Sequence, residues 1–444
     1  MIKRDLPNLI VGLGKTGLSC ARFLARRGEE FAAIDSRAHP PELAVFRREF
    51  PEAAVHLGGF DPMVIFRAQR LIVSPGVALA EAPITAAVNR GAEAVGDIEL
   101  FAQTGRAPVI AITGANGKST VTTLVGEMAA DAGREVRVGG NLGTPALDLL
   151  EENEPDLYVL ELSSFQLETT VSLNAAAATV LNLSPDHMDR YRDMNEYAAA
   201  KARIYRGDGV MVINADDPLV TAMAQRGRRI TRFGLGAPAG EDFGVVERAG
   251  QAWLAQGANL LMNAAELRIK GAHNIANALA ALALGAAVGL PMDSMLGTLR
   301  RFAGLPHRTQ WVATRDGVTW YNDSKGTNVG ATVAALQGMP GKVVLIAGGL
   351  GKGQDFSLLR DAVAAKARAV VLLGRDAPLI ERALAGVTPV VNVASMEDAV
   401  AHARELAQSG DTVLLSPACA SFDMFKGYDH RGDVFSEAVR SVLT

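Results

Sequence analysis

The stretch T-G-A-N-G-K-S-T, residues 113–120, constrains the fold of this chain more than any other. It directly follows the apolar run Val109 to Ile112, so we expect a strand, a glycine-rich turn and then a helix. Glycines in such a turn let backbone N–H groups point toward an anion at the N-terminus of the helix. Lys118 then reaches a nucleotide's β- or γ-phosphate, and Ser119 or Thr120 offers a hydroxyl to Mg²⁺. The sequence therefore predicts an α/β domain that binds ATP.

The loop departs from the strict phosphate-loop pattern at its first glycine. That pattern places a glycine five residues before Gly117, where this chain has Ile112. A glycine-rich turn that only caps a helix is the alternative interpretation. We favour a nucleotide site, because G-K-S-T comes directly after a strand. The predicted nucleotide contacts of the loop are Gly114, Ala115, Asn116, Gly117, Lys118, Ser119 and Thr120.

Length and the alternation of strands with helices predict three α/β domains. The chain has 444 residues, more than one hydrophobic core usually supports. Apolar runs of strand length alternate with helical stretches, as in parallel βαβ units, and the pattern restarts after Gly96 and after Pro306. We predict a Rossmann-like domain over residues 1–96, a phosphate-loop ATPase domain over 97–303, and a second Rossmann-like domain over 304–444.

Composition excludes several classes of protein. The 44 basic and 48 acidic side chains nearly balance, and no block of Lys and Arg indicates a nucleic-acid surface. Cys20 and Cys419 lie far apart, without the spacing of a zinc site or a disulfide framework. Neither a signal peptide nor an apolar stretch of membrane-spanning length is recognisable. We expect a cytoplasmic protein, monomeric, with no nucleic-acid or membrane partner.

A carboxylate beside the phosphate loop is a candidate metal ligand. Glu161 interrupts the apolar run 157–162, and a buried carboxylate there would need a cation nearby. A strand-end carboxylate in water is the alternative. Lys201 lies in the helical stretch Y-A-A-A-K-A-R-I-Y, whose small residues give its ammonium few polar neighbours. Taken alone, Lys201 is interpreted as a snorkelling side chain.

A second polar motif, N-L-S-P-D-H-M-D-R-Y at residues 182–191, follows a predicted strand. Ligands bind at such positions in α/β sheets, so His187 is a candidate functional residue. A structural role for His187, with Asp186 and Asp189 capping the next helix, is the alternative.

The N-terminal glycines allow two interpretations. G-L-G-K-T-G at residues 12–17 follows the first predicted strand, and Asp35 ends the next, a spacing typical of NAD-binding folds. A UDP-sugar also carries a pyrophosphate and a ribose, so it fits the same motif. An NAD-dependent oxidoreductase leaves the second phosphate loop unexplained. A purely regulatory nucleotide-binding module would need no metal-binding carboxylates.

Seven motifs, taken together and in this order, resemble the Mur ligases: T-G-A-N-G-K-S-T, L-E-L-S-S-F-Q-L-E, S-P-D-H-M-D-R-Y, H-N-I-A-N-A, G-L-P-H-R, N-D-S-K-G-T-N and S-P-A-C-A-S-F-D-M-F-K. They span all three segments, and S-S-F-Q-L and S-P-A-C-A-S resemble the members that add D-glutamate. The resemblance implies an ADP-forming ligase that joins D-glutamate to UDP-N-acetylmuramoyl-L-alanine through an acyl phosphate. Such a reaction belongs to peptidoglycan precursor synthesis, and thus to cell-wall biogenesis, cell shape and division. A folylpolyglutamate-type ligase is the alternative, which the UDP-type N-terminal domain disfavours.

The resemblance also implies a role for each matching residue. Lys118 holds the γ-phosphate, Ser119 and Glu161 bind one Mg²⁺, and His187 with a carbamylated Lys201 binds a second. Carbamylation needs a neutral amine, which a desolvated lysine with a lowered pKa provides. The implied catalytic set is Lys118, His187, Lys201 and Lys325, and the implied nucleotide contacts are Asn274, Arg308 and Asp323. Glutamate or the nearby phosphate is held by Lys325, Thr327, Lys352, Ser421 and Tyr428. The UDP is surrounded by Thr16, Asp35, Ser36, Arg37, Ser74, Gly76 and Asn141, and His187 also contacts substrate.

One stretch departs from the family pattern. Relatives usually carry an aspartate within the glycine-rich stretch 348–353, where this chain has Leu350 and Gly351 before Lys352. Asp355 is the nearby acidic residue that we consider as a substitute. We also expect the third domain to close over the other two about the linker 303–306.

Overall fold

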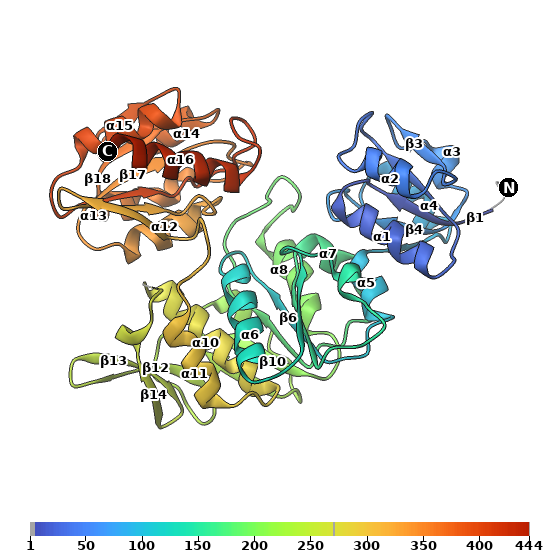
Figure 1. Cartoon of the computed structure of the whole chain (residues 1–444), viewed down its shortest axis with the longest axis horizontal. Helices are drawn as coiled ribbons and strands as arrows, with labels where there is room; N and C mark the ends of the chain where they lie inside the picture. The colour runs from blue at the N-terminus through green and yellow to red at the C-terminus, as the bar shows by residue number, and fades with distance from the viewer. Residues whose placement is uncertain (1–4, 270, 444) are drawn as a thin grey trace.

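The computed structural model describes residues 5–269 and 271–443, which form three α/β bodies. In Figure 1 the N-terminal body (blue) and the C-terminal body (red) lie on opposite sides of the view, above the central body. The three-domain α/β architecture predicted from the sequence is confirmed, whereas the exact boundaries at 96 and 303 stay predictions. In the described part of the chain, no helix combines the length and the apolar character needed to cross a bilayer.

A parallel five-stranded sheet forms the N-terminal body. Its strand order is β3-β2-β1-β4-β5, so the winding reverses between β1 and β4. Ligands bind beside such a reversal, at the carboxyl ends of the strands. Gly12, Asp35 and Ser74 lie at the carboxyl ends of β1, β2 and β4. The elements are β1 Leu6–Val11, α1 Lys15–Arg26, β2 Phe31–Asp35, α2 Leu43–Glu49, β3 Val55–Leu57, α3 Pro62–Ile65, β4 Ala68–Val73, α4 Ala82–Asn89 and β5 Glu93–Val95.

The central body is built on a sheet whose described strands run in the order β14-β13-β12-β11-β10-β9-β6-β8-β7. Strand β6 lies between β9 and β8, and Ile112 pairs with Glu161, so the phosphate loop and that carboxylate leave the sheet side by side. Helices α6, α10 and α11 bury one face of the sheet. The elements are α5 Asp97–Ala102, β6 Val109–Thr113, α6 Lys118–Asp131, β7 Val136–Gly140, η1 Ala146–Leu149, β8 Leu157–Glu161, α7 Ser164–Glu168, β9 Ala177–Val180, α8 Met194–Ala202, η2 Arg203–Tyr205, β10 Val210–Asn214, α9 Pro218–Thr221, β11 Ile230–Phe233, β12 Phe243–Arg248, β13 Gln251–Gln256, β14 Asn259–Asn263, η3 Ala264–Glu266, α10 Ala272–Ala287 and α11 Met292–Arg301.

The C-terminal body has a sheet of order β15-β16-β20-β17-β18-β19, in which only β15 runs antiparallel to its neighbour among the described strands. Its winding reverses at β20, so Asp323 after β16 and Ser416 after β20 lie at the carboxyl edge. The elements are β15 Gln310–Arg315, β16 Val318–Asn322, α12 Val329–Gly338, β17 Val343–Ala347, η4 Phe356–Leu359, α13 Arg360–Lys366, β18 Ala367–Leu372, α14 Ala377–Ala383, β19 Val390–Asn392, α15 Met396–Leu406, β20 Thr412–Leu415 and α16 Tyr428–Leu443.

Apolar packing joins the N-terminal body to the central body. One hydrophobic cluster runs without a break from Ile10 and Leu18 to Leu147 and Tyr158. Beside it the Ser19 hydroxyl donates to Asp148 at 2.7 Å. The apolar clusters of the C-terminal body contain only residues from 312 onward. The first two bodies are therefore held by a shared core, and the third has a core of its own.

Asp97, at the start of α5, is a buried carboxyl at the junction of the first two bodies. Its Oδ2 accepts a hydrogen bond from Gln166 Nε2 at 2.9 Å, whereas its Oδ1 has no partner among the described residues. Burial raises the pKa of Asp97 from its ordinary value of 3.8 to about 6, against the lowering effect of Gln166. Because the folded-state pKa is the higher one, ionisation of Asp97 destabilises the fold increasingly as the pH rises through this range.

We predict that Asp97→Asn stabilises the protein at pH 8. The amide cannot ionise, so the substitution removes a penalty of about 1–3 kcal/mol. At pH 5 the gain should be roughly half as large, because the penalty accumulates between the ordinary pKa of 3.8 and the folded-state pKa of about 6, and pH 5 lies near the middle of this range. Thermal melts of both proteins at the two pH values measure the difference. A loss of stability at pH 8, or the same gain at both pH values, would contradict this account.

Candidate active site

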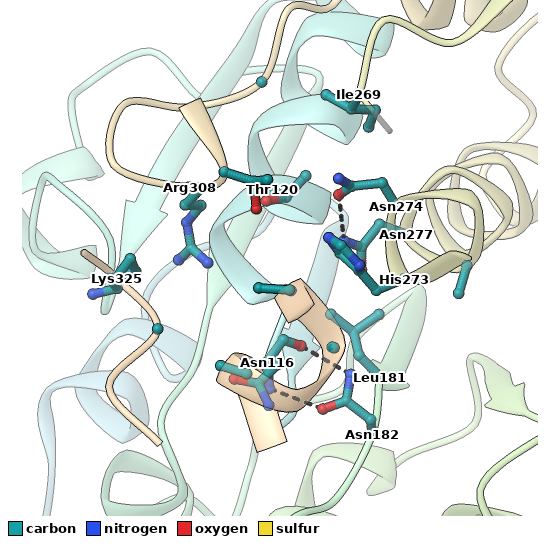
Figure 2. A pocket seen from close by; sticks show the side chains of 18 of the residues that line it. Asn116, Thr120, Leu181, Asn182, Ile269, His273, Asn274, Asn277, Arg308 and Lys325 are labelled. Carbon is teal, nitrogen blue, oxygen red and sulfur yellow. Dashed lines mark hydrogen bonds between the residues drawn. The ribbon is translucent and has the colours of Figure 1, made fainter. Parts of the chain in front are cut away.

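The phosphate loop connects β6 to α6 and depends on its glycines. Gly114 and Gly117 have φ angles of 150° and 82°, which side chains rarely allow. A Cβ on Gly117 would also lie 2.4 Å from Oδ1 of Asn277. Figure 2 shows how Asn182 holds the turn from the next strand: its Oδ1 accepts from the N–H of Asn116 at 2.8 Å, and its Nδ2 donates to the Asn116 carbonyl at 3.0 Å. Contacts with Asn182 thus fix the shape of the loop.

Two lysine ammonium groups converge on one carbonyl of this loop. Lys118 Nζ donates to the carbonyls of Gly114 and Ala115, both at 2.9 Å. Lys201 Nζ, from α8, donates to the Gly114 carbonyl at 3.0 Å and to the Thr113 hydroxyl at 3.2 Å. Burial lowers the pKa of Lys118, and burial with repulsion from Lys118 lowers the pKa of Lys201 well below its ordinary value. The snorkelling interpretation of Lys201 is wrong, because its side chain is buried in the site.

Glu161 keeps one carboxylate oxygen without a hydrogen-bond donor. Its Oε1 accepts from Asn141 Nδ2 at 2.7 Å, whereas its buried Oε2 has no partner among the described residues. Burial opposes ionisation, but the charge of Lys118 and the Ser119 hydroxyl hold the pKa of Glu161 below its ordinary value. A buried, ionised oxygen in this state is costly unless a cation approaches it. Oxygen of this kind is the ligand that Mg²⁺ prefers.

The protein supplies only part of a metal shell at this place. Within residues 5–269 and 271–443, no group of three or more His, Cys, Asp or Glu side chains could hold a metal ion. Mg²⁺ usually binds one or two carboxylates together with water and substrate phosphates, rather than a complete protein cage. Glu161 and Ser119 therefore fit a magnesium ion that arrives with a nucleotide.

His187 lies on the turn after β9 in a left-handed conformation, with φ at 57°. Burial lowers the pKa of His187, with help from the nearby lysines and against the charge of Asp186. The neutral imidazole is the form that binds metal. Neither Asp186 nor Asp189 caps the next helix, so that interpretation is wrong: the N-cap of α8 is Asp193, which accepts from the N–H of Glu196 at 2.9 Å. Asp186 pairs instead with Lys352 of the C-terminal body at 2.9 Å.

Three cavities lie in a row around these groups. The first cavity, of about 140 Å³, is bordered by Asn274, Arg308 and Asp323, and we name it the nucleotide cavity after the nucleotide contacts predicted at these residues. Figure 2 shows Arg308 and Asn274 on opposite sides of Thr120. The central cavity, of about 330 Å³, contains most of the groups described above. The N-terminal cavity, of about 540 Å³, lies at the carboxyl ends of β1, β2 and β4. The central cavity shares Asn116, Gly117, Arg308 and Lys325 with the nucleotide cavity, and Pro75, Gly76 and Asn141 with the N-terminal cavity.

The structure brings most of the predicted site residues to these cavities. All seven residues predicted around UDP, namely Thr16, Asp35, Ser36, Arg37, Ser74, Gly76 and Asn141, border the N-terminal cavity. The central cavity is bordered by Ala115, Lys118, Glu161, His187, Lys201, Lys325, Thr327 and Lys352. Of the described residues predicted to hold glutamate, Ser421 and Tyr428 do not border the central cavity. Tyr428 lies behind it, its ring centroid 3.8 Å from Lys325 Nζ.

Polar side chains in the N-terminal cavity already pair with one another. Both oxygens of Asp35 accept from Arg37, at 2.9 and 2.7 Å, and Oδ2 also accepts from the Leu13 N–H at 2.7 Å. Burial raises the pKa of Asp35, but these bonds outweigh it and hold the pKa below its ordinary value. The Ser74 hydroxyl donates to the Gly12 carbonyl at 2.8 Å. Asp35 and Ser74 therefore shape the glycine turn as well as line the cavity.

The central and C-terminal bodies meet through polar contacts. Arg308 donates to the Ser119 hydroxyl at 2.7 Å, and Asn328 Nδ2 donates to Asn116 Oδ1 at 3.1 Å. With the Lys352–Asp186 pair, these contacts hold the C-terminal body over the phosphate loop. Burial, together with repulsion from Arg308 and Lys118, lowers the pKa of Lys325 to about 8.

The glycine-rich stretch 348–353 has an acidic partner other than the one expected. Asp355 caps η4, because its Oδ1 accepts from the Ser357 N–H at 2.9 Å, so it does not substitute within the stretch. Asp376 Oδ2 instead accepts from the Gly351 N–H at 2.7 Å. The carboxylate that supports this loop thus comes from the loop between β18 and α14.

Sequence reasoning missed several amide side chains that organise the site. Asn182 holds the phosphate loop, Asn328 bridges two bodies, and Gln166 borders the N-terminal cavity. Each lies inside a motif quoted above, which is the signal that was available. Amides neither titrate nor carry charge, so motif chemistry alone assigns them no role.

Comparisons with known proteins agree over all three bodies. Three family models match: "Mur ligase MurD-like, N-terminal domain" over residues 7–96, "Mur ligase middle domain" over 112–285 and "Mur ligase, glutamate ligase domain" over 307–419. The UDP-N-acetylmuramoylalanine–D-glutamate ligase of Nitrosococcus oceani is 60% identical over 439 residues, 98% of this chain and 97% of that protein. The protein of the same name from Pseudomonas aeruginosa is 54% identical, covering 100% of this chain and 99% of its own length. A pseudomurein peptide ligase type C from Methanothermus fervidus shares the fold, with a TM-score of 0.63, 19% identity, and coverage of 98% of this chain and 100% of that chain.

Glu161→Gln tests whether the unpartnered carboxylate binds a metal. The amide has the same shape but no charge, so we expect the affinity for magnesium-ATP to fall at least about tenfold, the lower range for damaged metal sites. Binding of ATP without Mg²⁺ should change much less. Calorimetric titrations with and without Mg²⁺ measure both affinities. An equal loss in the two titrations would show that Glu161 does not act through the metal.

Proposed function

This chain belongs to the Mur ligase family, and from this premise we propose how its residues carry out the ligation. Its reaction joins D-glutamate to UDP-N-acetylmuramoyl-L-alanine with ATP, in peptidoglycan precursor synthesis. Relatives that are 54–60% identical over nearly their full length carry the name UDP-N-acetylmuramoylalanine–D-glutamate ligase. The names of these relatives disfavour an NAD-dependent oxidoreductase and a purely regulatory module, and the MurD-like N-terminal domain over residues 7–96 disfavours a folylpolyglutamate-type ligase. The observation that carries the site assignment is Glu161 Oε2, which is ionised and accepts no hydrogen bond from the described residues. It lies with Lys118 in the central cavity, which adjoins both the nucleotide cavity and the N-terminal cavity.

The order of the cavities supports the placement of the substrates. We assign UDP to the N-terminal cavity, where the N-terminus of α1 and Arg37 offer positive charge to a pyrophosphate. ATP takes the nucleotide cavity, with its γ-phosphate at Lys118 and a phosphate within reach of the Arg308 fork. The muramoyl-alanine carboxylate and the γ-phosphate then meet in the central cavity.

Two separate donor sets support two magnesium ions. Ser119 and Glu161 form the first set, and His187 with a carbamylated Lys201 forms the second. When bound, the ions neutralise phosphate charge and align the reacting oxygens. The lowered pKa of Lys201 favours the neutral amine that reacts with CO2, and the carbamate formed is an anion.

The chain's own residues mainly position the reactants and stabilise charge. The substrate carboxylate oxygen bonds to the γ-phosphorus of ATP, the bond to the ADP oxygen breaks, and an acyl phosphate forms. Lys118 offers its ammonium to the γ-phosphate oxygens throughout this transfer. The deprotonated amine of D-glutamate then attacks the acyl carbon, and inorganic phosphate leaves as the amide forms.

Cations of the C-terminal body suit the incoming dicarboxylate. Lys325, Thr327 and Lys352 border the central cavity from that side, and we assign the two carboxylates of glutamate to them. Lys352 is at present paired with Asp186, so glutamate replaces one carboxylate with another. Tyr428 supports Lys325 from behind, and Ser421 keeps its predicted role near the glutamate.

We further propose that the enzyme is a monomer and acts in the cytoplasm. One chain supplies all three cavities, so the site needs no second copy. The reaction consumes ATP, which is available in the cytoplasm.

A phosphate-release assay tests the function directly. With ATP, Mg²⁺ and UDP-N-acetylmuramoyl-L-alanine present, we expect sustained release with D-glutamate and little with L-glutamate, L-alanine or diaminopimelate. Lys118→Ala should abolish this release, because it removes the ammonium that faces the γ-phosphate, while calorimetry should show unchanged binding of the UDP-sugar. Undiminished turnover in the variant would refute the assignment of the phosphate loop.

The carbamate on Lys201 has a separate test. Lys201→Ala should lose nearly all turnover and regain part of it with added formate or acetate, because a short carboxylate can occupy the vacated anion position. Wild-type activity should fall when CO2 is removed from the buffer. If neither treatment changes the activity of the corresponding enzyme, Lys201 acts as an amine rather than as a carbamate.

A further inference from the structure

Arg190 connects the turn that carries His187 to the N-terminal body. Its backbone N–H donates to the His187 carbonyl at 2.9 Å. Its guanidinium reaches the loop after β4, where it donates to the carbonyl of Pro75 at 3.2 Å and to that of Val77 at 3.1 Å. These two carbonyls flank Gly76. Arg190 thus links the turn of a predicted metal ligand, through its backbone, to a loop of another body, through its side chain.

The guanidinium is held in place by the central body. Arg190 Nη2 lies 3.3 Å from Glu168 Oε2, and the Tyr191 hydroxyl donates to Glu168 Oε1 at 2.6 Å. Its carbon lies 4.3 Å from the ring centroid of Phe165. Phe165 in turn packs edge-on against the His187 ring, at 4.8 Å between centroids. A fixed arginine fork of this kind orients its partners, because few rotamers satisfy all its contacts.

The loop that Arg190 holds is part of the wall between two cavities. Pro75 and Gly76 border both the N-terminal cavity and the central cavity, and Asn141 is the third residue they share. Asn141 is fixed by its bond to Glu161. Any substrate whose UDP end lies in the first cavity and whose carboxylate reacts in the second has to pass this wall.

We propose that Arg190 is a positioning residue for acyl-phosphate formation. By fixing residues 75–77 relative to the His187 turn, it sets where the substrate carboxylate enters the central cavity and how close it comes to Lys118. The proposal rests on the proposed function and deepens it. The shared apolar core holds the N-terminal body in place without Arg190, so its loss should shift the loop rather than detach the body. A displacement of about 1 Å at a reacting centre can lower a rate about 100-fold.

The test compares three variants of the full-length enzyme. Arg190→Met removes the fork but keeps an apolar stem, and Arg190→Lys keeps a cation over Phe165 that can reach one carbonyl. Arg228→Met is the matched control, because Arg228 also donates to two backbone carbonyls, those of Tyr205 at 2.8 Å and Gly209 at 2.7 Å, but within the central body. Steady-state phosphate release gives kcat and KM, and calorimetry gives the affinities for UDP and ATP.

We expect Arg190→Met to lower kcat about 100-fold with the KM for the UDP-sugar within about threefold of wild type. Arg190→Lys should recover part of the loss, Arg228→Met should keep wild-type kcat, and both nucleotide affinities should be unchanged. An unchanged kcat in Arg190→Met, or a raised KM with kcat intact, would overturn the proposal, because Arg190 would then be dispensable or an ordinary binding contact. An equal loss in Arg228→Met would overturn it as general destabilisation. If the wild type itself releases no phosphate with D-glutamate, the proposed function is wrong. If the wild type is active and only the variants behave otherwise than expected, the positioning role of Arg190 alone is wrong.

Discussion

The unpaired negative charge at Glu161 Oε2 is the constraint around which the rest of the site is arranged. The carboxylate ends a strand next to the phosphate loop, where burial would normally neutralise it, yet Lys118 keeps it ionised. Lys118 and Lys201 in turn share the Gly114 carbonyl, and burial together with repulsion from Lys118 lowers the pKa of Lys201. One donorless oxygen, one ammonium and one amine with a lowered pKa thus lie within a single small cavity. This combination is costly in the protein alone and becomes favourable when a metal and phosphates complete it.

The three bodies are joined by different kinds of contact, and this difference suits a ligase that must both hold and enclose its substrates. A continuous apolar cluster, supported by the Arg190 fork, fixes the N-terminal body on the central body. The C-terminal body meets the phosphate loop through hydrogen bonds of Arg308 and Asn328, and it meets the turn after β9 through the ion pair between Lys352 and Asp186. Polar contacts of this type exchange readily with water or substrate groups. These contacts favour the prediction that the third domain closes about the linker 303–306, which stays a prediction.

Much of the architecture was predictable because buried parallel strands appear in the sequence as short apolar runs. The apolar runs 109–112 and 157–162 form β6 and β8 to within one residue of their limits, and the helix expected after the phosphate loop is α6. Strands β12 to β14 were not predicted, because they form an antiparallel edge whose residues are only partly buried and carry no continuous apolar run. Lys118 and Glu161 were predicted from motif chemistry, whereas Lys201, Lys325 and Lys352 were implied only by the family resemblance, and the roles of all five remain proposals. The partners of those residues were not predictable: whether Asp186 caps a helix or pairs with Lys352 depends on how two bodies meet.

The central claim is that Glu161 Oε2 faces a metal ion that arrives with the nucleotide. Crystals grown with Mn²⁺, ADP and UDP-N-acetylmuramoyl-L-alanine would locate that ion by its anomalous scattering. The account predicts a manganese peak within coordination distance of Glu161 Oε2, about 2–2.5 Å, next to a nucleotide phosphate. A complex in which Glu161 Oε2 pairs with a lysine or an amide, and every manganese peak lies elsewhere, would contradict it.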